Sequence, residues 1–432
     1  MQTQLAPPYQ GSPDGQTAQD ILRKCVHCGF CTATCPTYQL LGDELDGPRG
    51  RIYLIKQVLE GATPTERTQQ HLDRCLSCRN CETTCPSGVE YGKLLEIGRK
   101  AVAAQVPRSS PQRALRWLLK EGLTSRAFAP AMRLGQAVRP LLPAALRAKV
   151  PQRVAPGLWP QRQHARRVLL PEGCVQPAML PHINHASARV LDAAGLQVLR
   201  LSSGGCCGAL RLHLDDHSGA LAHMRANIDA WWPHVRPDSA QPVEAIVSNA
   251  SGCGVMLKDY GHQLRHDPAY AAKAARVSEL TRDLSELLPD LLPALQRKLA
   301  LADGARSPAV PRPKLAYHPP CTLQHGQQLR GGVEQGLRAL GFEVDTARTE
   351  AHLCCGSAGT YSVLQAGLSS QLRERKLGHL GELGAAQIVS ANIGCITHLQ
   401  SGTQTPVRHW IEVLDEALTA AAEAEAPNSA TA

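Results

Sequence analysis

The sequence predicts a multidomain protein in which a small α-helical module precedes two duplicated α/β lobes. The chain has 432 residues, which at about 150 residues per domain corresponds to two or three domains. Its 16 cysteines fall into two kinds of pattern. One motif occurs twice near the start of the chain, and a Cys-Cys-Gly sequence occurs once in each of two similar segments further on.

The composition is that of a globular protein whose basic charge is concentrated in one segment. Apolar residues make up 43% and charged residues 19% of the chain, and the net charge is +9. Between residues 101 and 170, thirteen Lys and Arg face a single acid, Glu121. This segment is either a docking surface for an acidic partner or anionic lipid headgroups, or a solvated helical linker. Nucleic acid is not expected as a partner, because no binding motif accompanies the basic residues and aromatics are only 4%.

No targeting or membrane-spanning segment is apparent. The polar start of the sequence has neither a basic nor an apolar signal-peptide region, and no run of 18 apolar residues occurs. We therefore expect a soluble or peripheral protein that is not secreted and that lies in the reducing cytoplasm. In a reducing compartment, clustered cysteines are metal ligands or redox thiols rather than disulfides.

The tandem motif predicts two [4Fe–4S] clusters. Each copy reads Cys-x2-Cys-x2-Cys-x3-Cys-Pro. Three thiolates at this spacing wrap around one cluster, and the cysteine before proline reaches the other. The expected ligands of cluster 1 are Cys25, Cys28, Cys31 and Cys85, and those of cluster 2 are Cys75, Cys78, Cys81 and Cys35. Zinc is the alternative, but zinc usually takes its ligands as two separated pairs.

The remaining eight cysteines reveal an internal duplication. The first copy contains Cys174, Cys206, Cys207 and Cys253, and the second contains Cys321, Cys354, Cys355 and Cys395. Corresponding cysteines are offset by 147, 148 and 142 residues. Short strand-like runs, such as 167–170 and 314–317, alternate with helical stretches such as 216–235, which predicts two α/β lobes. Each quartet of cysteines is a further iron–sulfur cluster, a zinc site or a set of reactive thiols.

These patterns divide the chain into six parts. We expect a flexible tail (1–17), a ferredoxin-like 2[4Fe–4S] domain (18–100), a basic, proline-containing helical linker (101–165), a first lobe (166–302), a second lobe (303–415) and a flexible tail (416–432). Within the second part, Arg49–Glu60 has its apolar residues at helical spacing and is expected to be a core helix.

The run of motifs resembles the iron–sulfur subunits related to heterodisulfide reductase, which carry CCG domains. Among these, the resemblance is strongest to the glycolate oxidase iron–sulfur subunits. It rests on Cys25–Leu40, Asp43–Gly61, Asn227–Pro233, Cys321–His325, Cys354–Tyr361 and Val407–Val413. It implies an oxidoreductase complex in which a flavin-bearing partner subunit oxidises glycolate. This chain, with no catalytic residue of its own, would pass electrons towards a respiratory quinone or another acceptor. The resemblance also implies that it can lie peripherally on the cytoplasmic side of the inner membrane.

The lobes depart from the best-known family pattern in one respect. That pattern ends in CxxC and supplies five cysteines to a noncubane cluster, whereas here Met256 follows Cys253 and His398 follows Cys395 at the last position. His398 is therefore either a replacement ligand or a hydrogen-bonding residue. Two other functions stay open: the iron–sulfur subunit of a related lactate or glycerol-3-phosphate dehydrogenase, and a thiol–disulfide reductase that uses the CCG lobes.

Overall fold

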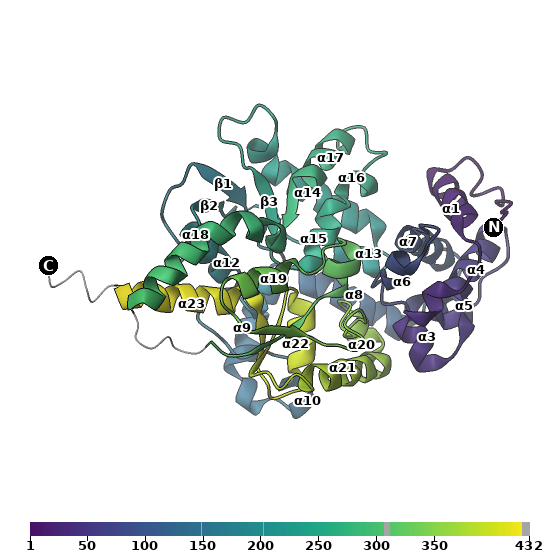
Figure 1. The fold of residues 1–432 in the computed structure, drawn as a ribbon. Coiled ribbons are helices and arrows are strands. Elements are labelled where there is room, and N and C mark those ends of the chain that lie inside the picture. Colours follow the sequence, from purple (N-terminus) through teal and green to yellow (C-terminus); the bar gives the residue numbers. More distant parts are fainter. Residues whose placement is uncertain (148, 202, 306–311, 426–432) are drawn as a thin grey trace.

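The predicted fold class is confirmed: a helical cysteine-rich module precedes two α/β lobes. A computed structural model describes residues 1–147, 149–201, 203–305 and 312–425 (Figure 1). The module comprises α1 (Pro13–Lys24), α2 (Phe30–Ala33), α3 (Pro36–Leu41), η1 (Glu44–Asp46), α4 (Pro48–Leu59), α5 (Glu66–Asp73), α6 (Asn80–Thr84) and α7 (Tyr91–Ala103). Helix α4 is the core helix expected at 49–60. A side chain at Gly98 of α7 would approach Ile55 of α4 to 2.5 Å, so these two helices pack closely.

The segment expected to be a flexible N-terminal tail packs against the module instead. The Met1 amino group donates hydrogen bonds to the carbonyls of Leu22 and Cys25, each at 3.0 Å. The Ala6 amide donates to the Leu59 carbonyl at 2.8 Å. Leu5 and other apolar side chains of the segment pack on the module core, which outweighs the disorder that its polar composition suggests.

The basic segment contains α8 (Ser110–Thr124), α9 (Phe128–Ala137), η2 (Arg139–Leu141) and α10 (Ala144–Arg147). It begins with ion pairs that join the module to the first lobe. Arg108 and Arg116 each pair with both Asp73 of the module and Asp215 of the lobe, at N–O distances of 2.5 to 3.2 Å. The start of this segment is therefore a connection between two parts of the structure rather than a detached linker.

The two lobes repeat one arrangement. Lobe 1 contains β1 (Arg166–Leu169), α11 (Gln176–Met179), α12 (His182–Ala193), β2 (Leu196–Leu199), α13 (Ala209–His213), α14 (His217–Val235), β3 (Ala245–Ser248), α15 (Ser251–Lys258), α16 (Tyr260–Gln263), α17 (Ala271–Leu280), β4 (Thr281–Asp283) and α18 (Leu284–Ala305). Lobe 2 contains β5 (Leu315–His318), η3 (Thr322–Gly326), α19 (Gly332–Ala339), β6 (Val344–Thr346), α20 (Tyr361–Leu364), α21 (Ala366–Gly381), β7 (Gln387–Ser390), α22 (Ile393–Gln400), β8 (Val407–His409) and α23 (Trp410–Glu425).

Each lobe is built on a four-stranded parallel sheet. The strand orders are β2-β1-β3-β4 and β6-β5-β7-β8. The registers also agree, since Val168 pairs with Ala245 in lobe 1 and Leu315 pairs with Gln387 at the equivalent position of lobe 2. The duplication seen in the cysteines therefore extends to the backbone pairing.

The lobes share one hydrophobic core at the end of the molecule opposite the module (Figure 1). Helix α18 packs against α19 and α23 of lobe 2, and α12 of lobe 1 also packs against α23. Gly336 of α19 allows the close approach to α18, because a side chain there would overlap Leu288. The boundary expected at 302/303 falls inside α18. Of the tail expected at 416–432, residues 416–425 continue α23, and 426–432 lie outside the described residues.

Candidate metal centres

The first group of four thiols is assembled from two separate loops of the module. Cys25, Cys28 and Cys31 lie between α1 and α2, and Cys85 follows α6. All four line one small pocket. Burial, and then the neighbouring Cys25, raises the pKa of Cys31 to about 11, and Cys28 and Cys85 act in the same direction. Cys85, the last cysteine of the second motif, therefore lies beside the first three cysteines of the first motif.

The second group has the reciprocal composition. Burial, and then Cys78, Cys75 and Cys35 among its neighbours, raises the pKa of Cys81 well above its ordinary value. The two loops also bend in the same way: His27 and Gly29 have φ of 57° and 86°, and Ser77 and Arg79 have φ of 52° and 60°. The module thus contains two similar cysteine loops, and the last cysteine of each motif lies with the first three cysteines of the other motif.

These eight thiols fit iron–sulfur ligation. Closely grouped buried thiols cannot all ionise without a positive charge among them, because each thiolate raises the pKa of the next. A metal centre supplies that charge and binds the thiolate form. Thiol ligands at this spacing are those that hold [4Fe–4S] clusters.

A buried polar network supports the second group. Arg51, fully buried, donates to Thr37 Oγ1 at 3.1 Å and pairs with the equally buried Asp46. Thr37 Oγ1 lies 3.3 Å from Cys35 Sγ. Burial opposes the charge of Arg51, but Cys75 and other nearby anionic groups outweigh it and raise its pKa. A permanent positive charge therefore lies beside this group.

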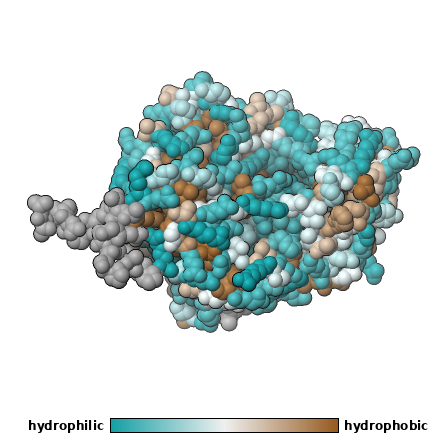
Figure 2. All heavy atoms as spheres, viewed as in Figure 1, coloured by the Kyte–Doolittle hydropathy of each residue, from teal (hydrophilic) through white to brown (hydrophobic). Residues whose placement is uncertain are grey.

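The two groups differ in their surroundings. Next to the first group, Val26 and Phe30 are 69% and 60% exposed, and Cys28 itself is exposed. Figure 2 shows apolar side chains gathered on the outer face of the module, at the right of the view. The first group is consequently accessible to a partner protein.

The second group faces lobe 2. Cys78 and Leu76 pack against a small apolar cluster that includes Cys321 and Cys354. Three hydrogen bonds cross this contact: Tyr361 Oη to the Arg74 carbonyl (3.1 Å), Thr83 Oγ1 with His325 Nδ1 (2.9 Å) and Asn80 Nδ2 to the His352 carbonyl (3.4 Å). The module and lobe 2 thus meet through cysteine-bearing surfaces.

The lobe cysteines lie at the carboxyl ends of the strands, where ligands bind in open parallel sheets. In lobe 1, Cys174 follows β1 and Cys253 follows β3, and these strands are neighbours. The same relation holds for Cys321 after β5 and Cys395 after β7. The ends of both sheets and the module surround a cavity of about 610 Å³, lined by Cys75, Cys78, Cys174, Cys206, Cys207, Cys253, Cys321, Cys354 and Cys395 among others.

The lobe 1 thiols are held by neutral hydrogen bonds to their backbone. Asn227 Nδ2 donates to the Cys206 carbonyl and Tyr260 Oη to the Cys207 carbonyl, each at 2.9 Å. The neighbouring thiols Cys174 and Cys207 donate to Cys206, which lowers its pKa and raises theirs. One thiolate in this quartet is therefore stabilised by its neighbours.

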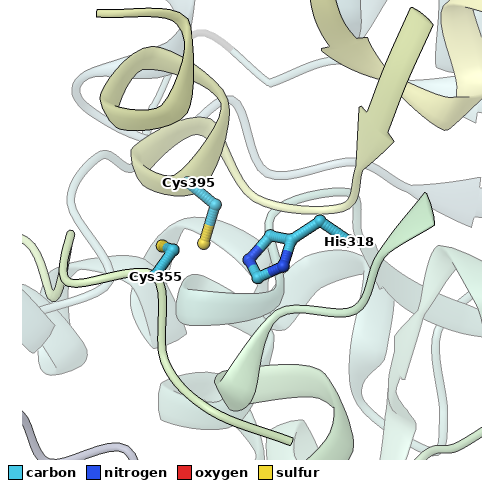
Figure 3. A group of neighbouring side chains, drawn as sticks. All are labelled: His318, Cys355 and Cys395. Carbon is cyan, nitrogen blue, oxygen red and sulfur yellow. The ribbon is translucent and has the colours of Figure 1, made fainter. Parts of the chain in front are cut away.

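The lobe 2 thiols are more deeply buried and have a histidine among them. Cys321, Cys354, Cys355 and Cys395 are all buried, and the Sγ atoms of Cys321 and Cys354 are 3.7 Å apart. Figure 3 shows His318, at the end of β5, directed towards Cys395 and Cys355. Burial lowers the pKa of His318 well below its usual value, so its ring is neutral.

His398, which the sequence offers as a possible replacement ligand in lobe 2, is not part of this group of thiols. His398 Nε2 lies 3.1 Å from Ser369 Oγ and 3.3 Å from the Ser369 carbonyl. These contacts agree with a hydrogen-bonding role. From the sequence, His318, three residues before Cys321, is open to the same two roles as His398, a replacement ligand or a hydrogen-bonding residue.

Comparison with known proteins agrees with this architecture. Residues 21–89 match the family described as "4Fe-4S dicluster domain", and its eight cysteines imply two [4Fe–4S] clusters. Residues 168–258 and 315–400 both match the "Cysteine-rich domain" (CCG). No helix in the described parts of the chain is long and apolar enough to cross a membrane.

Two relatives align over most of this chain, and a third over about half of it. The glycolate oxidase iron–sulfur subunit of Escherichia coli (strain K12) is 51% identical over 97% of this chain and 99% of its own. The probable glycolate oxidase iron–sulfur subunit of Bacillus subtilis (strain 168) is 30% identical over 89% of each chain. The lactate utilization protein A of Geobacillus thermodenitrificans (strain NG80-2) is 27% identical over 56% of this chain and 95% of its own. The chain therefore belongs to the family of glycolate oxidase iron–sulfur subunits.

Proposed function

We propose that this chain is the electron-transfer subunit of a complex that oxidises glycolate to glyoxylate. A flavin on a partner subunit would take the hydride of glycolate, and a respiratory quinone or another acceptor would receive the electrons. The proposal is carried by the two groups of four cysteines, each of which combines three cysteines of one motif with the last cysteine of the other. They occur in a chain that is 51% identical to a glycolate oxidase iron–sulfur subunit over nearly its whole length. Clusters bound at these thiols accept and release single electrons.

The surroundings of the two thiol groups support different roles for them. Cys28 and the exposed Val26 and Phe30 offer a partner subunit close access to the first group. The second group lies between Arg51 and the cysteines of lobe 2, and its Cys75 and Cys78 line the interior cavity. The chain thus holds one site at its outer surface and one beside the interior cavity.

The alternatives differ in support. The relative named for lactate utilization aligns with 56% of this chain, against 97% for the glycolate oxidase subunit, which favours glycolate over lactate. The cavity lined by cysteines of both lobes is the observation that keeps a thiol–disulfide reductase as a second candidate. The substrate test below separates these functions.

The experiment is substrate-dependent reduction of the whole complex, purified anaerobically with its partner subunits. Glycolate should reduce the iron–sulfur centres within the turnover time, as seen by EPR, whereas glycerol 3-phosphate and a low-molecular-weight dithiol should not. Faster reduction by lactate, glycerol 3-phosphate or the dithiol would contradict the proposal.

Substitutions test the ligand assignment. Cys28→Ser and Cys85→Ser should remove the same EPR signal, because both residues belong to the first thiol group, and each should reduce glycolate turnover by at least about a hundredfold. Cys35→Ser should remove the other signal. If Cys35→Ser instead removed the signal that Cys28→Ser removes, and Cys85→Ser removed the other signal, the assignment of Cys85 and Cys35 to the two thiol groups would be wrong.

We also propose that the basic segment contacts an anionic membrane surface. Within 110–158, Trp117, Leu134 and Leu141 are 61%, 66% and 85% exposed, and they alternate with exposed cations such as Arg126 and Arg133. Exposed apolar side chains among basic ones suit a lipid interface better than an acidic protein surface, since each basic residue contributes about 1 kcal/mol at anionic lipid.

Vesicle flotation tests this contact. The complex should float with vesicles containing phosphatidylglycerol, and not with pure phosphatidylcholine, and binding should weaken at high salt. The double variant Arg133→Glu/Leu134→Glu should lose flotation while it retains glycolate turnover with a soluble dye. A matched double variant at exposed sites outside the segment, Arg236→Glu/Val363→Glu, should float normally. Equal flotation of all forms would exclude this segment as the membrane contact.

A further inference from the structure

A buried histidine in lobe 2 lacks the hydrogen bonds that its ring requires. His318 is 1% exposed. In the part of the chain that the structure describes, neither of its ring nitrogens has a hydrogen-bond partner. Leaving a buried polar group unsatisfied costs about 1–3 kcal/mol. The site is therefore incomplete without a group that binds the imidazole.

Two thiols stand where such a group would be bound. The Sγ atoms of Cys355 and Cys395 and a ring nitrogen of His318 all lie within 4.8 Å of one another. Figure 3 shows the three side chains around one point: Cys355 from a loop, Cys395 from helix α22 and His318 from the end of β5. Two thiolates on one tetrahedral ion, each about 2.3 Å from it, lie about 3.8 Å apart. The two Sγ atoms, which lie within 4.8 Å of each other, are therefore close enough to bind a single ion.

The sheet topology explains why these residues meet. His318 is the last residue of β5, and its backbone position pairs with Ser390, the last residue of the neighbouring strand β7. The chain turns directly from β7 into α22, which carries Cys395. Asn392 Nδ2, at the start of that helix, donates to Cys395 Sγ at 3.6 Å. This hydrogen bond orients the thiol, as contacts to metal ligands do in metal sites.

Lobe 1 does not contain the same set. The pairing of β1 with β3 has the same register as the pairing of β5 with β7. The residue of lobe 1 that corresponds to His318 is therefore Pro171. Proline offers no nitrogen ligand. Cys207 and Cys253 occupy the positions of Cys355 and Cys395, so they provide a matched pair of thiols without the imidazole.

We propose that lobe 2 binds a single zinc ion through Cys355 Sγ, Cys395 Sγ and a ring nitrogen of His318, and that lobe 1 has no such site. Two thiolates and one imidazole are donors that zinc prefers. Three protein ligands leave a fourth position for water or another small ligand. Cys395 also lines the central cavity, so the ion would lie at the wall of that cavity. This site is independent of which substrate the complex oxidises.

Metal content and X-ray absorption of the full-length chain test the proposal. Chain purified anaerobically and dialysed against a weak chelator should contain about eight irons and about one zinc. Zinc K-edge spectra should show two sulfur ligands and one histidine nitrogen. His318→Gln and Cys355→Ser should each lower the zinc content at least about tenfold and leave iron unchanged. Absence of zinc from the wild-type chain, or about twelve irons with matching sulfide, would overturn the proposal.

Matched variants make the result specific. His398→Gln changes another lobe 2 histidine close to Cys395 in sequence, and Cys207→Ser changes the lobe 1 counterpart of Cys355; both should keep zinc. If His398→Gln lost zinc and His318→Gln kept it, the ligand set would be wrong. His318→Cys guards against misfolding of the glutamine variant, since it should retain zinc and change its spectrum to three sulfur ligands.

Discussion

Lobes 1 and 2 carry the same four cysteines on sheets of the same strand order, but their surroundings differ. In lobe 1, Cys174 and Cys253 are partly exposed to the cavity, and neutral side chains such as Asn227 hold the backbone of the pair. In lobe 2 all four cysteines are buried, and the buried cation Lys376 and His318 lie close to them.

This difference shows that a cysteine motif does not determine its own chemistry. The duplicated strands place the thiols equivalently, and residues outside the motif decide what the thiols can bind. The lobes also meet the module differently: lobe 2 through neutral hydrogen bonds around Cys78, and lobe 1 through ion pairs and buried carboxyl groups.

The largest expected effect concerns the core that the lobes share. Leu414 of α23 is fully buried in this core. Leu414→Ala should destabilise the protein by about 2–5 kcal/mol, because it leaves a cavity between the lobes. Amide hydrogen exchange should then increase in both sheets, as measured by mass spectrometry.

The control is a leucine in the separate core of lobe 1. Leu264 is equally buried there, and Leu264→Ala should cost a similar free energy but increase exchange mainly around β3 and α17. If Leu414→Ala affected lobe 2 alone, the two lobes would not share a cooperative core.

A second prediction separates the two contacts of the module by pH. Burial, and then repulsion from Asp259, raises the pKa of Glu96 from 4.5 to about 7 at the lobe 1 contact. Between these pH values the folded protein binds more protons than the unfolded chain, so stability falls as the pH rises. Glu96→Gln should remove this loss and stabilise the protein by about 1–3 kcal/mol at pH 8. Denaturant titrations across the pH range measure it.

The lobe 2 contact should respond in the opposite direction. Burial lowers the pKa of His325 from 6.5 to about 4. The unfolded chain therefore binds the extra proton first, and this contact loses stability as the pH falls from 6.5 towards 4. His325→Gln should weaken the acid-side loss and leave the alkaline side unchanged. Identical pH profiles for the two variants would refute the distinction between the contacts.

The smallest effects are expected for two ion pairs, one between the lobes and one inside lobe 1. Arg189 of α12 pairs with Asp415 of α23 at 2.6 Å and also donates to the Leu158 carbonyl at 3.0 Å. Arg189→Ala should cost about 1 kcal/mol. Arg166→Ala, which breaks the more exposed pair with Glu244 inside lobe 1, should cost less than about 0.5 kcal/mol. Denaturation midpoints give both values, and a larger loss for Arg166→Ala would contradict the assigned importance of the inter-lobe pair.

Much of the architecture was predictable because it follows local patterns. The helical spacing of Ile52, Ile55 and Val58 predicted α4, and the offsets between cysteines predicted the repeated lobes. The grouping of Cys85 with the first loop follows from the proline after it, which directs the chain away from its own motif.

The rest depends on contacts between distant segments. Nothing local to 284–305 shows that this helix lies against α23, because its leucines would suit the core of either lobe. His318 gained its significance only when β5 and β7 were adjacent, which placed Cys395 beside it. The sequence offered His398 at the motif position instead, and its ring is occupied by Ser369.

The shared core also constrains how the protein is made. Domains generally fold in order of synthesis, the N-terminal ones first. Helix α12 of lobe 1 packs against α23, which follows every other described element in the chain. Lobe 1 therefore cannot complete its packing while the ribosome is still adding lobe 2. During translation the face of lobe 1 that α23 covers stays exposed, and the core between the lobes closes only when α23 has been released.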